Sequence, residues 1–261
     1  MTIDRKRAEN AFAAYVRPYN SADPKVRLKI EHTYRVAALC ERIARSLGLP
    51  GEDIDLAWLC GLLHDVGRFE QLRRYGTFND AESIDHAACS AEELFDKGGI
   101  RAYLDDTAGD ALLRTAVETH SAYRLPEGLD ERTRRFCNIL RDADKIDILK
   151  VNVEVPMEDI YNVTTEALRT SAVSGEVMAQ FYEHHAIPRA CKRTPADNAV
   201  GHISLVYELV YPESLRAVLE QGYLEKMMNF STQNPATAAQ FAAIRTHMRG
   251  WIDGRLHNLS S

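Results

Sequence analysis

The sequence lacks the cysteine patterns that build disulfide frameworks or zinc knuckles. It has five cysteines, an odd number, widely spaced and without a CxxC pair. Such cysteines are typical of reduced core residues, so we expect a cytoplasmic protein. The N-terminal segment has no apolar stretch of the secretory type. No apolar run approaches the roughly 18 residues that span a membrane, so we expect no membrane partner.

The sequence also lacks an excess of basic residues. Lys and Arg number 32 against 38 Asp and Glu, which gives a formal net charge of -6. A surface that follows a nucleic-acid backbone needs Lys and Arg in excess, so we expect no nucleic-acid partner. A small phosphorylated substrate is compatible with this balance, because a few local Arg residues are enough to bind it.

Signals for β-hairpins, Gly-rich phosphate loops and internal repeats are missing, and most segments have the apolar period of an α-helix. Asp4 caps a first short helix, and Asp23 begins a long helix that ends before Gly48. The segment 53–67 is apolar around most of its circumference. It therefore predicts a buried central helix, which we expect to end at Gly67.

The stretch from residue 68 to 82 breaks this periodicity, and we expect a long polar loop of functional importance. Further helices are expected at 83–97, 106–121, 131–150, 157–171, 174–186, 197–211, 213–221 and 235–257. Because no Gly/Ser linker divides the chain, we expect one continuous all-α domain. Residues 1–150 would form its core, and residues 151–261 a C-terminal helical extension packed on that core. Apolar faces after residue 200 are compatible with a homodimer.

The adjacent pair His64–Asp65 stands near the end of the apolar segment 53–67. A buried carboxylate is costly unless a cation compensates its charge. The cation can be a metal ion, or it can be an arginine such as Arg68. The dipeptide alone does not decide between these two possibilities.

More side chains of the metal-binding kind follow, about one on each successive helix. His32 lies on the helix before the pair, His86 and His120 lie on the next two helices, and Asp142 and Asp144 lie on the helix after those. Helices packed in a bundle can bring such side chains together at one interior site. The pattern therefore predicts a metal centre.

In this order the residues resemble the H…HD…D signature of the HD-domain superfamily. The segments LLHDVGRFEQ and RDADKIDIL are similar to its HD helix and its terminal Asp helix, and the resemblance covers about residues 25–150. It implies an HD-domain-like helical bundle with additional C-terminal helices. The extended H…HD…H…H…D form, which accompanies two metals in that superfamily, is matched by His32, His64, Asp65, His86, His120 and Asp144.

The last ligand of this pattern requires a choice between Asp142 and Asp144. They lie about 200° apart on a helix, so both cannot face one metal. The triplet Ala143-Asp144-Lys145 resembles the family's A-D-K/R setting. This favours Asp144 as the ligand and leaves Asp142 behind the ligands or in an ion pair.

Imidazole and carboxylate ligands suit divalent transition metals such as Fe, Mn, Co, Ni or Zn. Six ligands permit two ions, with Asp65 bridging them and orienting a metal-bound hydroxide as the catalytic group. If His86 and His120 were only core residues, the remaining four ligands would still hold one ion. The site would then be mononuclear.

The resemblance implies a metal-dependent phosphohydrolase, in which metal-bound hydroxide attacks a phosphoester or phosphoanhydride of a nucleotide or other small phosphorylated metabolite. A branch of the same superfamily uses a similar set to hold two irons and activate O₂, so a di-iron oxygenase is an alternative. A non-catalytic nucleotide-sensing module is a third hypothesis. The identity of the metals and O₂ consumption separate the first two.

A phosphate substrate also requires positive charge beside the metals. Arg68 follows the HD pair and Lys145 follows Asp144, which makes these two the better candidates for substrate binding. Arg35, Arg73 and Arg74 are weaker candidates, because each is compatible with an ordinary solvated surface position.

Overall fold

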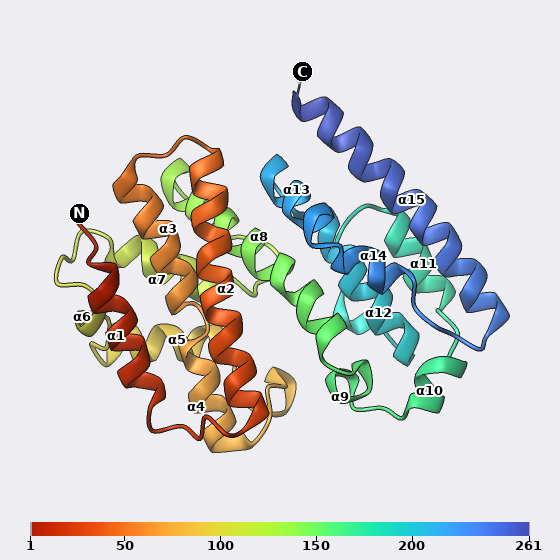
Figure 1. Ribbon diagram of the computed structural model, residues 1–261, viewed down its shortest axis with the longest axis horizontal. Helices are drawn as coiled ribbons and strands as arrows, with labels where there is room; N and C mark the ends of the chain where they lie inside the picture. The colour runs from red at the N-terminus through yellow and green to blue at the C-terminus, as the bar shows by residue number, and fades with distance from the viewer. Residues whose placement is uncertain (1, 261) are drawn as a thin grey trace. The chain divides into compact units, whose positions relative to one another are not determined.

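The computed structural model describes residues 2–260, with side chains for residues 2–258, and this part of the chain consists of helices and loops without a strand (Figure 1). The prediction of an all-α fold is confirmed. The chain divides into two compact units, Met1–Asp144 and Lys145–Ser261. The expectation that the second part packs on the first as one continuous domain stays a prediction.

The first unit holds the segments that carry the predicted ligands. Its elements are α1 (Arg5–Val16), α2 (Pro24–Ser46), α3 (Gly51–Leu63), α4 (Val66–Tyr75), η1 (Asp80–Glu82), α5 (His86–Ala91), η2 (Glu92–Asp96), α6 (Ile100–Tyr103) and α7 (Asp110–Thr119). Helix α8 (Glu131–Glu154) begins in this unit and continues into the second. Helices α2 and α3 pack along each other, and both bury apolar side chains (Figure 1).

The predicted caps of the first two helices are present. The Asp4 carboxylate accepts a hydrogen bond from the backbone N–H of Arg7, and the Asp23 carboxylate accepts one from that of Lys25. Both bonds satisfy backbone donors that a helix start leaves without a partner.

The expected helix end at Gly67 is wrong. Helix α3 ends at Leu63, and Gly67 lies inside α4. The expected loop 68–82 is also wrong for its first half, because α4 continues to Tyr75. The polar residues there are helical, since Glu70 pairs with arginines three and four positions later, and such pairs stabilise a helix.

Gly67 allows α4 to pack closely against α5. A Cβ at this position would lie 2.5 Å from the backbone nitrogen of Ser90 and 2.6 Å from the carbonyl oxygen of His86. The Ser90 hydroxyl fastens the contact, because it accepts from the Gly67 N–H and donates to the His86 carbonyl, both at 2.9 Å. The start of α5, where His86 lies, is thus held against α4.

Replacing this glycine should therefore destabilise the first unit. We expect Gly67→Ala to lower the free energy of unfolding by about 1–3 kcal/mol, because the added methyl group overlaps rigid backbone. Denaturant unfolding followed by circular dichroism measures the change. Gly51→Ala is the matched control, since a Cβ at Gly51 meets nothing within 4 Å. Equal stability of the two variants would contradict the close approach.

The second unit consists of shorter helices followed by one long helix. Its elements are α9 (Met157–Tyr161), α10 (Thr165–Thr170), α11 (Gly175–Tyr182), η3 (Arg189–Cys191), α12 (Pro195–Ile203), η4 (Ser204–Glu208), α13 (Pro212–Gln221), α14 (Tyr223–Met228) and α15 (Pro235–Ser260). The helix expected at 157–171 is broken, because Asn162 adopts a left-handed conformation with φ of 53°. Within the described chain, no helix has the length and apolar character needed to cross a bilayer.

Candidate metal centre

The six predicted ligands lie together in the first unit, although they come from different elements. They are His32 on α2, His64 directly after α3, Asp65 directly before α4, His86 at the start of α5, His120 directly after α7 and Asp144 on α8. The four imidazoles and the Asp65 carboxylate are at most 4% exposed. The short turn between α3 and α4 therefore presents its His and Asp side chains to a buried site.

The Asp65 carboxylate lies between two pairs of histidines. Its Oδ2 atom lies 3.6 Å from the Nε2 atoms of both His32 and His64. Its Oδ1 atom lies 3.6 Å from Nε2 of His86 and 3.7 Å from Nε2 of His120. Each oxygen of one carboxylate thus faces a separate imidazole pair, which is the arrangement of a bridging ligand.

Asp144 joins the first of these pairs. Its Oδ1 atom lies 3.2 Å from Nε2 of His32 and 3.8 Å from Nε2 of His64. Asp142, which the sequence analysis places behind the ligands, is completely buried on the same helix. The carboxylate in the cluster is therefore the one favoured from the sequence, and its role as a ligand stays a prediction.

Three of the imidazoles are held by hydrogen bonds at their Nδ1 atoms. Nδ1 of His64 bonds to the Gly61 carbonyl and Nδ1 of His120 to the Val117 carbonyl, both at 2.7 Å. A carbonyl only accepts, so each Nδ1 carries the proton and each Nε2 offers a lone pair to the cluster. Nδ1 of His86 bonds to the Asp80 carboxylate at 2.6 Å in the same way. Such bonds orient metal-binding histidines.

This geometry fits metal ions. Within the pairs, the Nε2 atoms are 3.3 Å apart for His32 and His64 and 3.0 Å apart for His86 and His120. Nitrogen ligands about 2.0–2.1 Å from one ion lie roughly 3 Å from each other. The Oδ1 atom of Asp65 is also buried without a hydrogen-bond partner among the described residues. An ion in each pair would satisfy these lone pairs.

The charges of the cluster favour the forms that bind metal. Burial lowers the pKa of His64, and burial together with the neighbouring histidines lowers the pKa of His120 to about 3. Both imidazoles are therefore neutral near pH 7. Burial raises the pKa of Asp65, but the Lys29 cation and other neighbouring positive charge outweigh it and hold that pKa well below its usual range. The Asp65 carboxylate is therefore ionised.

Comparison with known proteins identifies the first unit. Residues 30–149 match the family model described as HD domain, and all six clustered residues fall within this range. The chain carries an HD domain. HD domains bind divalent metals, and the His and Asp groups of this one are placed to hold them.

One curated relative matches a short part of the chain. It is the 3'3'-cGAMP-specific phosphodiesterase 1 of Vibrio cholerae serotype O1, 36% identical over 69 residues. The match covers 25% of this chain and 16% of the relative. No solved structure matches the chain. The HD domain and this relative together support a phosphohydrolase.

Lys29 is a cation of the HD domain site that the sequence reasoning missed. Its Nζ atom donates to Oδ2 of Asp65 at 2.7 Å, and it lies 5.4 Å from the centre of the Phe78 ring. Lys29 precedes His32 by three residues, so helical spacing on one face could have indicated it. Without metal, this ammonium compensates the buried carboxylate.

The cations predicted from the sequence differ in their surroundings. Arg68 lies beside the cluster, because its Nε atom is 3.6 Å from Oδ1 of Asp65. Lys145 is 9% exposed and follows Asp144 on α8. Arg35 lies 3.8 Å from Glu31 of its own helix. Their binding of substrate stays a prediction.

The remaining two candidates for substrate binding contact Glu70. Arg73 and Arg74 both contact the Glu70 carboxylate, at 2.5 Å and 3.1 Å. Glu70 in turn accepts a hydrogen bond from Tyr19 near the end of α1. These contacts join α4 to the N-terminal segment and give the two arginines a structural role.

Asp80 is a second residue that the sequence reasoning missed. It connects His86 to Arg68, because its Oδ2 atom lies 2.6 Å from Nδ1 of His86 and its Oδ1 atom accepts from Arg68 at 2.7 Å. Burial raises the pKa of Asp80, but the bonds to His86 and the Arg68 charge together lower it to about 2. The carboxylate therefore orients the imidazole while ionised.

Removing this carboxylate should weaken the second imidazole pair. We expect Asp80→Ala to reduce the affinity for one of the metals by about 10- to 100-fold, because His86 loses the acceptor that orients it. Asp80→Asn is the matched control, since its amide oxygen can still accept from the imidazole. Metal titration followed by calorimetry measures both affinities. An unchanged affinity in Asp80→Ala would contradict this orienting role.

Proposed function

We propose that the HD domain is a metal-dependent phosphohydrolase that cleaves a phosphoester or phosphoanhydride of a nucleotide or other small phosphorylated metabolite. The proposal rests on Asp65, whose two oxygens face separate pairs of histidines at 3.6–3.7 Å. Two ions held about 3.5–4 Å apart by a shared ligand are typical of enzymes that hydrolyse phosphate esters.

The relative from Vibrio cholerae suggests which substrates to test first. Its name describes a phosphodiesterase specific for 3'3'-cGAMP. We therefore extend the proposal to the phosphodiester bond between nucleotides as the first substrate class.

Some residues of the site would hold metal, and others would bind phosphate. When bound, two divalent ions supply a clamp for phosphate oxygens and lower the pKa of water. The imidazoles of His64 and His120, which burial keeps neutral, and the ionised carboxylates of Asp65 and Asp144 would supply ligands, together with His32 and His86. Lys29 and Arg68 have cationic nitrogens 2.7 Å and 3.6 Å from Asp65, so they can bind the outer oxygens of a phosphate next to it.

A substrate screen with defined metals tests the proposal. The purified chain is loaded with Mn²⁺ or Co²⁺ and offered cyclic dinucleotides, linear dinucleotides and nucleoside phosphates. We expect release of phosphate or a nucleotide product, in proportion to the bound metal. A preparation of Asp65→Ala made in parallel controls for contaminating phosphatases.

The oxygenase alternative has a distinct outcome in the same experiment. Uptake of O₂ by an iron-loaded chain, without hydrolysis of any phosphorylated substrate, would overturn the proposal. Absence of bound transition metal, with no activity after metal is added, would instead support a nucleotide-sensing module.

A further inference from the structure

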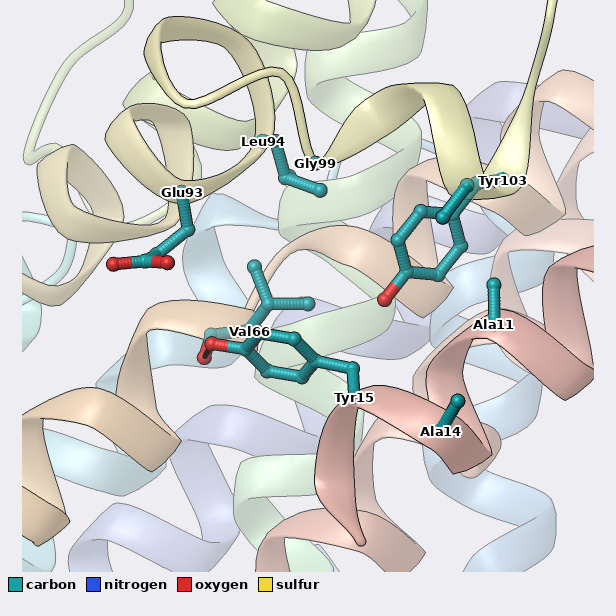
Figure 2. A pocket seen from close by; sticks show the side chains of 9 residues that line it. Ala11, Ala14, Tyr15, Val66, Glu93, Leu94, Gly99 and Tyr103 are labelled. Carbon is teal, nitrogen blue, oxygen red and sulfur yellow. Dashed lines mark hydrogen bonds between the residues drawn. The ribbon is translucent and has the colours of Figure 1, made fainter. Parts of the chain in front are cut away.

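A cavity of about 270 Å³ lies in the first unit between α1, the start of α4, η2 and α6 (Figure 2). Its walls are mostly apolar and include Ala11, Val66, Leu94 and Ala102. None of the residues that line it is a predicted metal ligand. The cavity is therefore separate from the site of the proposed hydrolysis.

Tyr103 supplies the cavity with an unused polar group. Its side chain is 4% exposed, and its hydroxyl has no hydrogen-bond partner among the described residues. Figure 2 shows the ring on one wall, with the hydroxyl directed toward the space between Val66 and Tyr15. A buried hydroxyl without a partner is unfavourable, so a group inside the cavity that bonds to it would be stabilised.

The other polar groups at the cavity are already engaged. The Tyr15 hydroxyl donates to the backbone carbonyl of Val66 at 3.0 Å. Glu93 lies on the left in Figure 2, and its carboxylate pairs with Lys97 at 2.6 Å and with Arg74 at 3.7 Å. No unbalanced charge of these residues is left to attract an ion. The chemistry of the walls thus favours a neutral occupant.

We propose that this cavity binds a small, neutral, largely apolar molecule with one hydrogen-bond acceptor, to which the Tyr103 hydroxyl donates. Engineered apolar cavities of about 150 Å³ hold benzene. A cavity of about 270 Å³ is larger, so it fits a compact bicyclic molecule. The occupant would contact Val66, the residue that follows Asp65 in the chain.

Three related probes test the ligand class by calorimetric titration of the full chain. They are 1-indanone, a neutral bicyclic ketone; indane, which lacks the acceptor; and 1-indanecarboxylate, which carries a charge. We expect 1-indanone to bind most tightly. Tyr103→Phe should weaken its binding about fivefold, the effect of one neutral hydrogen bond, and should leave the binding of indane unchanged.

A second variant fills the cavity from α1. Ala14 lines the cavity but is exposed, so Ala14→Trp can block the space without disturbing the core. We expect it to abolish binding of 1-indanone. Ala13→Trp is the matched control, because Ala13 is exposed on the same helix and does not line the cavity. Circular dichroism confirms that both variants fold.

The proposal is overturned if 1-indanone fails to bind, if the carboxylate binds as tightly, or if Tyr103→Phe binds the ketone as well as the original chain does. Binding that persists in Ala14→Trp would also overturn it, because the ligand would then lie elsewhere. These measurements need no metal and no hydrolysis. Their failure and the failure of the proposed phosphohydrolase are therefore distinguishable.

Discussion

Asp65→Ala is expected to remove both metal ions from the chain and to lower phosphate hydrolysis at least about 100-fold. The reason is that each oxygen of this carboxylate faces a different histidine pair, so one substitution takes a ligand from both positions. Elemental analysis after loading with Mn²⁺ measures the metal content. Circular dichroism should show that the helices are kept, because the substituted side chain lies in a turn.

Asp96→Ala provides a matched control for the loss of a carboxylate. Asp96 lies in the same HD domain, but its side chain is half-exposed and pairs with Arg114. We expect this control to keep its full metal content and activity. The alternative account of Asp65 is a salt bridge with Lys29 that needs no metal. Full metal content in Asp65→Ala would support that account and contradict the proposed bridge.

The sequence predicted the helices whose ends carry local signals. Asp4 and Asp23 cap their helices as expected, because a capping side chain needs only the next few residues of the chain. The turn at His64–Asp65 carries no such signal, since apolar residues precede it and helical spacing continues after it. Gly67 was mistaken for a helix end. Its small size instead serves a contact with α5 that depends on the tertiary fold.

In the candidate site, too, some features follow from the sequence and others depend on the tertiary fold. The six clustered residues were predicted because their side-chain types and their order along the chain match a family pattern, and the structure brings them together. Lys29 and Asp80 were missed, because their roles depend on distances of 2.7 Å to Asp65 and 2.6 Å to His86. Helical spacing places Lys29 on the same face as His32, but it gives neither distance. Arg73 was a weaker candidate because it lies in the segment that follows the HD pair, and its binding of substrate stays a prediction; in the structure it pairs with Glu70.

His86→Ala should reveal how many ions the cluster holds. We expect the metal content to fall from about two ions per chain to about one, since only the second imidazole pair loses a ligand. The position at the first imidazole pair keeps His32, His64 and the nearby Asp144. The contacts among these three residues do not involve His86. Hydrolysis should fall at least about tenfold, because a single ion no longer clamps the phosphate from both sides.

His257→Ala is the matched control, because His257 is an exposed histidine of α15 in the second unit. It should leave the metal content and the activity unchanged. Comparison of the two ligand variants then tests the bridge itself. If Asp65→Ala loses two ions and His86→Ala loses one, then Asp65 is shared and His86 belongs to a single ion. If the original chain and His86→Ala both hold one ion, the centre is mononuclear, and its second imidazole pair has a structural role.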